Sequence, residues 1–243
     1  NWSMKSQDPP IEILQPIFNL FTNGNLQQAL ANSRKMLEKF PNSVILCNIS
    51  GASNVGLMQF DDAIDNYKKA LKIKPEYAEA YYNIGIALKK KGDLEGAIVS
   101  YKHALEIKSD YAEAYYNMGN ALKDKGNFEG AIVSYKNALE IKSDFAEAYY
   151  NMGIALKKND DLEAAIDSYK NVLKIKPNHA EAYINMGNIH KDKGDLESAI
   201  DSYKNVLKIE PGHAEAYFNI GDVLRDKGDL EAAIDSYKKA IEI

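Results

Sequence analysis

The sequence repeats itself every 34 residues, and this period restricts the possible folds more than any other feature. The segment AEAYYNIGIALKKKGDLEGAIVSYKHALEIKSDY fills residues 78–111, and close copies follow at intervals of 34 residues, beginning at Ala112, Ala146, Ala180 and Ala214. A weaker copy fills residues 44–77, and a divergent copy fills residues 10–43. Because each repeat of such an array buries its apolar face against its neighbours, the period predicts one continuous solenoid over residues 10–243.

A residue's place is its position counted from the first residue of its unit. The units are 10–43, 44–77, 78–111, 112–145, 146–179, 180–213 and 214–243. The twentieth place is alanine in all seven units: Ala29, Ala63, Ala97, Ala131, Ala165, Ala199 and Ala233. The eighth place is glycine in six units: Gly51, Gly85, Gly119, Gly153, Gly187 and Gly221. The twenty-fourth place is tyrosine in six units: Tyr67, Tyr101, Tyr135, Tyr169, Tyr203 and Tyr237. Both exceptions fall in unit 10–43, so this unit is the most divergent.

Each unit is predicted to form two helices. In unit 78–111, apolar residues recur at spacings of three and four over 81–88 and again over 94–105, which is the period of one helical face. Between these runs, Gly92 is suited to the left-handed conformation that ends a helix, and Asp93 is suited to capping the next helix. Small residues at Gly85 and Ala97 would let the two backbones approach closely, while Tyr101 fills the adjoining space. Each unit is therefore expected to be a helical hairpin.

Both ends of the array depart from the pattern. Pro16 falls where a helix interior is expected, so the first helix is expected to be kinked or to start late. Residues 1–9 precede the repeats and are expected to be a disordered tail or a remnant of a longer or engineered sequence. The last unit stops at Ile243 without a polar capping helix, so we expect either a longer protein or completion by another subunit. Exposed Ile241 and Ile243 would favour end-to-end self-association.

The recurring pattern of aromatic residues, glycine, alanine, tyrosine and terminal proline resembles the tetratricopeptide repeat, a helix-turn-helix unit of 34 residues. The resemblance covers residues 10–243 and is most specific over 78–243. It implies an all-α fold, a right-handed superhelix of about seven repeats whose first helices line a concave groove. It also implies a protein-binding scaffold.

Composition and motifs argue against several other classes of function. With 35 acidic and 30 basic residues, the chain lacks the basic excess of a nucleic-acid-binding protein. The single cysteine cannot form an intramolecular disulfide, and no apolar run reaches the length that spans a bilayer, so we expect a cytoplasmic protein. No phosphate-binding loop, catalytic serine motif or metal-binding cysteine pair occurs. We therefore expect neither enzymatic activity nor a cofactor or metal ion.

The remaining polar residues suggest individual roles in structure. Cys47 occupies the place of Tyr81 in the next unit and is interpreted as a packed apolar residue. His190 takes a place that is leucine in neighbouring units and is interpreted as a tolerated substitution. The glycosylation sequon that begins at Asn48 falls inside a predicted helix, so we discount it.

The sixth place of the first helix carries an asparagine whose recurrence helix packing does not require. Asparagine is a mediocre helix former, and the apolar face is already supplied by other places. The residues are Asn83, Asn117, Asn151, Asn185 and Asn219. A ladder of carboxamides offers paired donors and acceptors to an extended peptide backbone. The alternatives are that repeat duplication copied the residue without use, or that it bonds adjacent repeats to each other.

The unit AEAYYNMGNALKDKG is similar to repeats in the peptide-recognition arm of O-linked N-acetylglucosamine transferases. That resemblance implies that the five asparagines grip the backbone of a bound peptide. Neighbouring places would complete the same surface. They are the fifth place (Tyr82, Tyr116, Tyr150), the ninth (Asn120, Asn188) and the twelfth (Lys89, Lys123, Lys157, Lys191). Glutamate at the second place, as in Glu113, argues against a clamp for an anionic C-terminus.

The sequence therefore predicts a scaffold that binds an extended segment of a partner protein or peptide. One alternative is the non-catalytic, substrate-recruiting part of a larger glycosyltransferase or sulfotransferase. Another is a structural module that self-assembles through its ends. Neither a nucleic-acid partner nor membrane insertion is expected.

Overall fold

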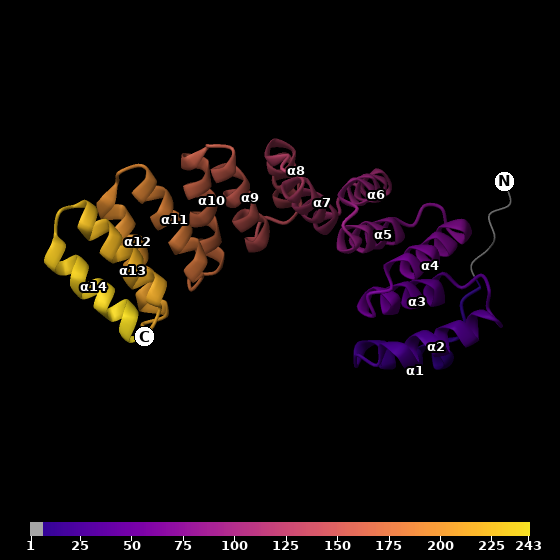
Figure 1. Cartoon of the computed structure of the whole chain (residues 1–243). Coiled ribbons are helices and arrows are strands. Elements are labelled where there is room, and N and C mark those ends of the chain that lie inside the picture. The colour runs from indigo at the N-terminus through magenta and orange to yellow at the C-terminus, as the bar shows by residue number, and fades with distance from the viewer. Residues whose placement is uncertain (1–6) are drawn as a thin grey trace. The chain divides into compact units, whose positions relative to one another are not determined.

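The computed structural model describes residues 7–243, and every regular element in this range is an α-helix. Fourteen helices follow one another as seven hairpins within these residues (Figure 1). The first helices are α1 (Ile11–Thr22), α3 (Val44–Gly56), α5 (Ala78–Lys91), α7 (Ala112–Asp124), α9 (Ala146–Lys158), α11 (Ala180–Asp192) and α13 (Ala214–Asp226). The second helices are α2 (Leu26–Leu37), α4 (Phe60–Ile73), α6 (Leu94–Ile107), α8 (Phe128–Ile141), α10 (Leu162–Ile175), α12 (Leu196–Ile209) and α14 (Leu230–Glu242). The predicted all-α class with about seven helix-turn-helix repeats is confirmed.

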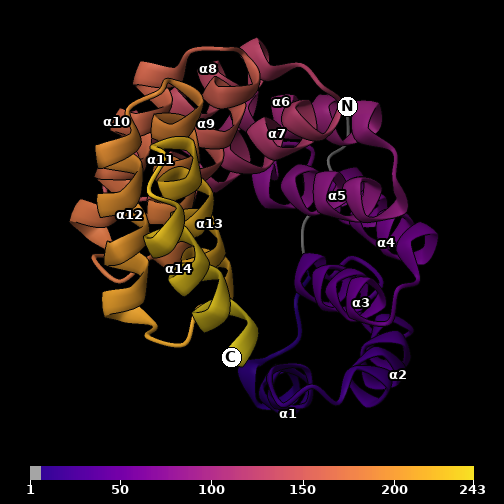
Figure 2. The ribbon, with the colours of Figure 1, turned by 60° about the vertical axis from the view of Figure 1, so that its left-hand side comes forward.

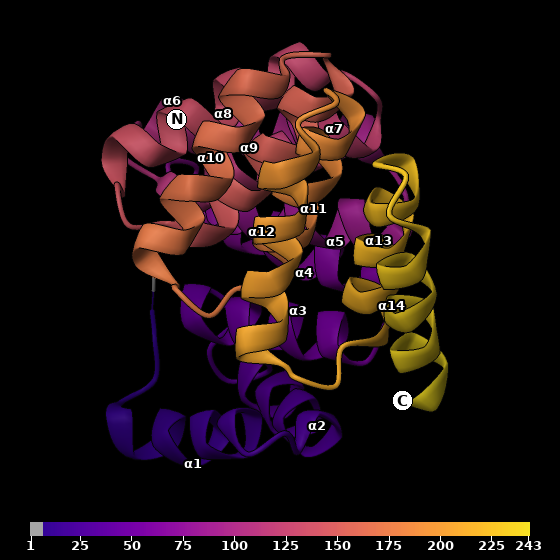
Figure 3. The same cartoon turned by 90° about the vertical axis from the view of Figure 1, so that its left-hand side faces the viewer.

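The helices form two compact units, each of which stacks hairpins in the same way. Unit 1 is Asn1–Ile141 and holds α1 to α8, and unit 2 is Lys142–Ile243 and holds α9 to α14. Within unit 1, α3 contacts α5 and α5 contacts α7, and the second helices form a separate layer (Figure 2). Within unit 2, α13 lies between α12 and α14 (Figure 3). A single continuous array across both units stays a prediction.

Each hairpin turns through a left-handed residue at the fifteenth place. Gly92 has φ 93°, and the carboxylate of Asp93 accepts a hydrogen bond of 2.9 Å from the backbone N–H of Gly96. Both predictions for this turn are therefore confirmed. Met58 and Asp160 keep the same backbone, with φ 60° and 61°, although their side chains disfavour it. The turn is imposed by the hairpin packing and not by glycine alone.

The contact between the two helices of a hairpin depends on a missing side chain. A Cβ atom added at Gly119 would lie 2.6 Å from Cε1 of Tyr135, and the other five eighth-place glycines meet their own tyrosine ring at 2.5 to 2.7 Å. In unit 10–43 the large and the small residue of this contact exchange places. Ile17 replaces the glycine and Ser33 replaces the tyrosine, and both side chains are buried. The large residue has moved to the other helix, which conserves the volume of the core.

The first described residues contain helix α1 and a contact between Asp8 and the second hairpin. Helix α1 begins at Ile11, one place later than the other first helices, and continues through Pro16. Residues 1–6 of the predicted tail lie outside the described residues, whereas the carboxylate of Asp8 accepts hydrogen bonds from Ser43 Oγ and from Ile45 N, at 2.5 and 3.1 Å. Cys47 is packed among apolar residues as predicted, and burial raises the pKa of its thiol.

One face of α3 is buried yet polar. Ser50, Ser53 and Asn54 are fully buried, and neither their hydroxyls nor either polar atom of the Asn54 amide has a hydrogen-bond partner among the described residues. The corresponding places in α5 hold Ile84, Ala87 and Leu88. Burying polar groups without partners is unfavourable, so this face is a weak point in the stacking of unit 1.

We predict that Asn54→Leu stabilises the chain by about 1 to 3 kcal/mol, because leucine of similar size removes two unsatisfied buried atoms. Urea unfolding followed by circular dichroism measures the change. Asn66→Leu is the control, since Asn66 is also buried, with 7% exposure, but its amide donates a hydrogen bond of 2.8 Å to the carbonyl of Asp62. If both substitutions shift the urea midpoint in the same direction, the explanation from unsatisfied groups is wrong.

We predict opposite effects of the same substitution at two helical glycines. Gly119→Ala should cost about 1 to 3 kcal/mol, because the methyl group overlaps the ring of Tyr135. Gly130→Ala should stabilise the chain by up to about 1 kcal/mol, because alanine is the better helix former. The added Cβ would lie 2.9 Å from the side chain of Asn127, which can shift, because Ala164 and Ala232 stand at this place with cap bonds of 3.3 and 3.2 Å. Thermal unfolding of the two variants would contradict the packing argument if Gly119→Ala melted no lower than the parent.

Candidate peptide-binding surface

The predicted ladder residues all lie on first helices and are neither fully buried nor fully exposed. The residues at the seventh and eighth places of each first helix lie in the core of the hairpin. The side chain at the sixth place therefore lies at the edge of that core. The five asparagines are Asn83, Asn117, Asn151, Asn185 and Asn219. The fifth-place tyrosines Tyr82, Tyr116 and Tyr150 are half-buried in the same way. Places five, six, nine and twelve of the first helices are called the ladder surface.

The amides of the ladder bond adjacent repeats to one another. Asn117 Nδ2 donates to the hydroxyl of Tyr82 at 2.8 Å, and Asn185 Nδ2 donates to the hydroxyl of Tyr150 at 3.1 Å. In each pair the asparagine belongs to the repeat that follows the tyrosine. The inter-repeat bond that the sequence left as an alternative is therefore present. It fixes the orientation of the amide, whose oxygen accepts no hydrogen bond from the described residues.

A related network continues into the weaker second repeat. Asn83 Nδ2 donates to Asn48 Oδ1 at 3.4 Å, and Asn48 Nδ2 donates to the hydroxyl of Tyr77 at 3.0 Å. Asn48 occupies the fifth place, where later repeats have Tyr82 and its equivalents. The sequon at Asn48 was discounted, although its position at the fifth place of the repeat indicates that it belongs to the ladder surface.

The ninth place determines whether the core tyrosine of the same repeat is satisfied. The hydroxyl of Tyr135 donates to Asn120 Oδ1 at 2.8 Å, and that of Tyr203 donates to Asn188 Oδ1 at 2.6 Å. Where the ninth place is isoleucine, at Ile86 and Ile154, the buried hydroxyls of Tyr101 and Tyr169 have no hydrogen-bond partner within residues 7–243. Asn120 and Asn188 each accept a hydrogen bond from a core tyrosine, and their contact with a peptide stays a prediction.

Three of the four twelfth-place lysines pair with acidic residues of the following repeat, and Lys123 pairs within its own repeat. Lys89 Nζ lies 2.8 Å from the Asp124 carboxylate, Lys157 lies 3.7 Å from Asp192, and Lys191 lies 3.0 Å from Asp222. Lys123 lies 4.0 Å from Asp124. The basic edge predicted for the ladder surface is therefore partly neutralised by carboxylates. A ligand would meet a mixed-charge border at this edge.

The opposite edge carries the second-place glutamates, which are exposed. A hydrogen bond from Lys176, together with the backbone N–H of Glu147 itself, lowers the pKa of the Glu147 carboxyl. The thirty-fourth place adds rings that the sequence prediction did not include. Tyr111 stacks on Tyr82 with ring centroids 4.8 Å apart, and His179 stacks on Tyr150 at 5.0 Å. His179 Nδ1 also accepts a hydrogen bond from Ala182 N at the start of α11, so it is a helix cap.

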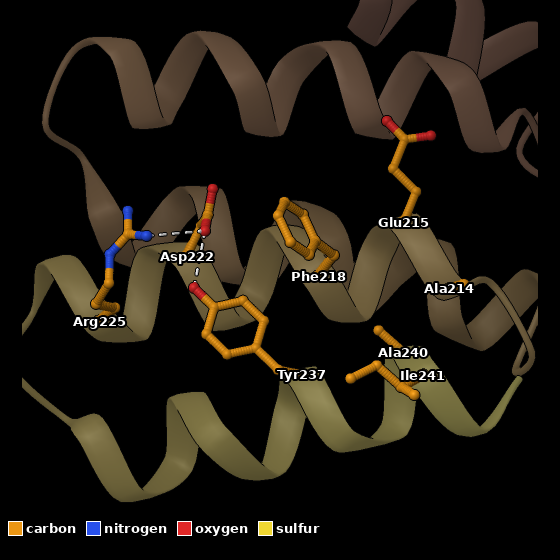
Figure 4. A pocket seen from close by; sticks show the side chains of 8 residues that line it. All are labelled: Ala214, Glu215, Phe218, Asp222, Arg225, Tyr237, Ala240 and Ile241. Carbon is orange, nitrogen blue, oxygen red and sulfur yellow. Dashed lines mark hydrogen bonds and ion pairs between the residues drawn. The ribbon is translucent and has the colours of Figure 1, made fainter.

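A pocket of about 740 Å³ opens between α13 and α14 in unit 2 (Figure 4). Phe218, Ala240 and Ile241 supply apolar walls. At one side Asp222 accepts a hydrogen bond of 2.8 Å from the hydroxyl of Tyr237 and lies 3.4 Å from Arg225. Although burial opposes it, the hydrogen bonds from Lys191 and Tyr237 lower the pKa of the Asp222 carboxyl. Asp222 is thus held as an anion and serves the same tyrosine role as Asn188.

Within residues 7–243, no group of three histidine, cysteine, aspartate or glutamate side chains is arranged to hold a metal ion. In the same range, no helix has both the length and the apolar character needed to cross a membrane.

Comparisons with known proteins agree with this geometry. Family models described as TPR repeat match residues 59–92, 87–126 and 119–160, and models described as tetratricopeptide repeat match residues 146–179 and 178–243. The chain belongs to the tetratricopeptide repeat family. Its repeats also resemble the probable UDP-N-acetylglucosamine–peptide N-acetylglucosaminyltransferase SEC of Arabidopsis thaliana, with 33% identity over 76 residues. That match covers 31% of this chain but spans only 8% of the plant enzyme.

Solved structures of other tetratricopeptide proteins share the fold. The MamA protein is 33% identical with a TM-score of 0.63, over 65% of this chain and 93% of that one. YrrB, described as a TPR protein with an unusual peptide-binding site, is 29% identical with a TM-score of 0.64, over 72% of this chain and 91% of its own. The C-terminal part of a TPR repeat-containing protein from Cytophaga hutchinsonii has a TM-score of 0.78 at 23% identity, over 94% and 98% of the two chains, and shows the fold alone.

The ninth place is isoleucine in some repeats and asparagine in others, and this difference leads to a prediction with paired controls. Tyr101→Phe should stabilise the chain by about 1 kcal/mol, because it removes a buried hydroxyl that has no partner. Tyr135→Phe should destabilise it by about 1 kcal/mol, because Asn120 then loses its donor. Unit 2 offers the same pair in Tyr169→Phe and Tyr203→Phe. Urea midpoints of the four variants check the prediction, and equal shifts at Tyr101 and Tyr135 would contradict it.

Proposed function

We propose that this chain is a non-catalytic binding scaffold that holds an extended segment of a partner protein along the ladder surface. The family, shared with a protein described as having a peptide-binding site, supports binding as the general role. The observation that carries the finer proposal is the orientation of the ladder amides. Asn117 and Asn185 each give their N–H to the tyrosine of the preceding repeat, which leaves a carboxamide oxygen as an acceptor in equivalent places.

An acceptor of this kind suits the backbone of a peptide better than a particular side chain. Every residue of an extended peptide except proline offers one N–H, so recognition by repeated acceptors is independent of sequence. The stacked rings beside the amides, such as Tyr82 and Tyr111, supply apolar contact area for the side chains of the peptide. The mixed-charge border at the twelfth place would then favour some peptide sequences over others.

The test distinguishes the loss of the carboxamide acceptor from the loss of the hydrogen bond between repeats. Peptides are selected from a displayed library of random unstructured sequences, and the affinity of a selected synthetic peptide is measured by fluorescence anisotropy. We predict that Asn117→Ala or Asn185→Ala weakens binding roughly fivefold to tenfold, the value of one lost neutral hydrogen bond. Tyr82→Phe and Tyr150→Phe are the matched controls, because they break the same inter-repeat bond but keep the carboxamide.

Three results are distinguishable. Loss of affinity in the asparagine variants alone supports the ladder, and N-methylation of the contacting peptide bond should then produce the same loss. An equal loss in the tyrosine controls would show that only the positioning of the repeats matters. Unchanged affinity in all four variants would contradict backbone binding at these residues while leaving a scaffold function at another surface.

A second candidate function rests on the match to the plant glycosyltransferase. The chain would then be the substrate-recruiting region of a larger enzyme, with the ladder surface presenting the acceptor protein. The 33% identity is confined to 76 residues of repeats, which supports a shared mode of binding more directly than a shared reaction. Sequencing the gene beyond the codon for Ile243 decides between the two, because the recruiting role requires a catalytic domain in the same protein.

A further inference from the structure

The polar face of the first helices repeats over two hairpins. In α5 the ninth, twelfth and thirteenth places are isoleucine, lysine and lysine, and in α7 they are asparagine, lysine and aspartate. The same two sets of residues return in α9 and α11 in the same order. Because α5 and α7 lie in unit 1 and α9 and α11 lie in unit 2, each unit contains one complete copy of this two-helix pattern. We call each copy a paired site.

The contacts of the ladder surface repeat together with the residues. In unit 1, Asn117 Nδ2 donates to the hydroxyl of Tyr82 at 2.8 Å, and in unit 2, Asn185 Nδ2 donates to the hydroxyl of Tyr150 at 3.1 Å. The ring of each of these tyrosines stacks on a thirty-fourth-place ring, with centroids 4.8 and 5.0 Å apart. Each paired site therefore presents a carboxamide acceptor beside a stacked pair of rings.

The isoleucine of each paired site is unfavourable for the core that it adjoins. Beside it, the core hydroxyls of Tyr101 and Tyr169 are buried and have no hydrogen-bond partner within residues 7–243. In the hairpin that follows, an asparagine at the same place accepts a hydrogen bond from the core tyrosine. Leaving a buried hydroxyl unpaired costs stability, so core packing does not account for the isoleucine. Ile86 and Ile154 are half-buried on the ladder surface, where an apolar contact with a ligand accounts for both.

Each paired site also has one lysine that is not neutralised. The twelfth-place lysine of its first helix pairs with the thirteenth-place aspartate of its second helix, at 2.8 Å in unit 1 and 3.7 Å in unit 2. The thirteenth-place lysines, Lys90 and Lys158, are exposed and form no ion pair with residues 7–243. Each lies four residues after the isoleucine and so on the same helical face. An apolar contact and an unpaired cation thus stand side by side in both units.

A short extended segment with an apolar residue beside an acidic one is the chemical complement of a paired site. Its backbone N–H reaches the carboxamide acceptor, its apolar side chain covers the isoleucine and the tyrosine ring, and its carboxylate pairs with the lysine. Packed helices lie about 8 to 10 Å apart and an extended chain advances about 3.3 Å per residue, so about six residues cover the two helices of one site.

We propose that each paired site binds one copy of the same short acidic and apolar segment, so that a single chain holds two such segments at once. The protein is then a bivalent scaffold, with one site in unit 1 and one in unit 2. This inference rests on the peptide binding proposed for the ladder surface, and it adds the number of sites and the chemistry of the bound segment.

Isothermal titration calorimetry of the full chain tests the number of sites. The probe is a synthetic peptide from the displayed library, shortened to the smallest length that still binds. We expect two peptides per chain with similar affinities. Asn117→Ala should weaken one site roughly fivefold to tenfold and leave the other unchanged, and Asn185→Ala should give the same biphasic isotherm. The double variant should weaken both sites.

Removal of the unpaired lysines tests the chemistry of the segment. Lys90→Ala and Lys158→Ala should each weaken one site roughly twofold to fivefold, and replacing the acidic residue of the peptide by its amide should abolish the difference from the parent chain. Lys136→Ala is the matched control and should leave both sites unchanged. Lys136 is an exposed lysine on the second helix α8, so this variant removes the same charge away from the ladder surface.

The possible failures are distinguishable. One peptide per chain, weakened by both asparagine substitutions, would overturn the paired sites but keep a single peptide-binding ladder. Affinities that neither asparagine variant changes would overturn both this inference and the proposed function. Lysine variants that bind as tightly as the parent chain would overturn the acidic character of the segment. Circular dichroism checks that each variant folds.

Discussion

The contact between an eighth-place glycine and a twenty-fourth-place tyrosine is the interaction on which every other feature of this protein depends. The tyrosine ring occupies the space of an absent Cβ atom, as Tyr135 does against Gly119. The same close contact recurs in six repeats, and the ring is buried in five of them, at Tyr67, Tyr101, Tyr135, Tyr169 and Tyr203. The first repeat shows that volume is what matters, because Ile17 and Ser33 exchange the large and small partners between the helices.

As a consequence, each of the six hairpins that has this tyrosine places a phenolic hydroxyl between its two helices. This hydroxyl donates a hydrogen bond where the ninth place is Asn120, Asn188 or Asp222. Where the ninth place is Ile86 or Ile154, it has no partner among the described residues. These polar residues of the first helices therefore form hydrogen bonds with core tyrosines in the absence of a ligand. The same holds for Asn117 and Asn185, which join successive repeats through a tyrosine. A surface built in this way is rigid, and rigid acceptors lose less conformational entropy on binding a peptide.

Much of the fold was predictable because the residues that end and cap helices recur at the same places in most repeats. The glycine and aspartate that end one helix and cap the next recur in most units, so errors at single positions, such as Met58 or Asp160 in the turn, do not obscure the pattern. The buried polar face of α3 was harder to anticipate. Ser50, Ser53 and Asn54 are individually ordinary helix residues, and only the docking of α3 against its neighbours makes them unsatisfied.

The amino-acid sequence by itself determined the helical hairpin and its recurrence along the chain, because these follow from local periodicity and side-chain size. Only the tertiary structure decided which polar atoms are already used. Whether Asn117 offers a donor or an acceptor depends on Tyr82, which lies 35 residues earlier in the chain. Whether Ile200 and Tyr203 of α12 are buried depends on α13, which packs against them. Hydrogen bonds and burial between repeats arise from their packing, and sequence spacing alone does not report them.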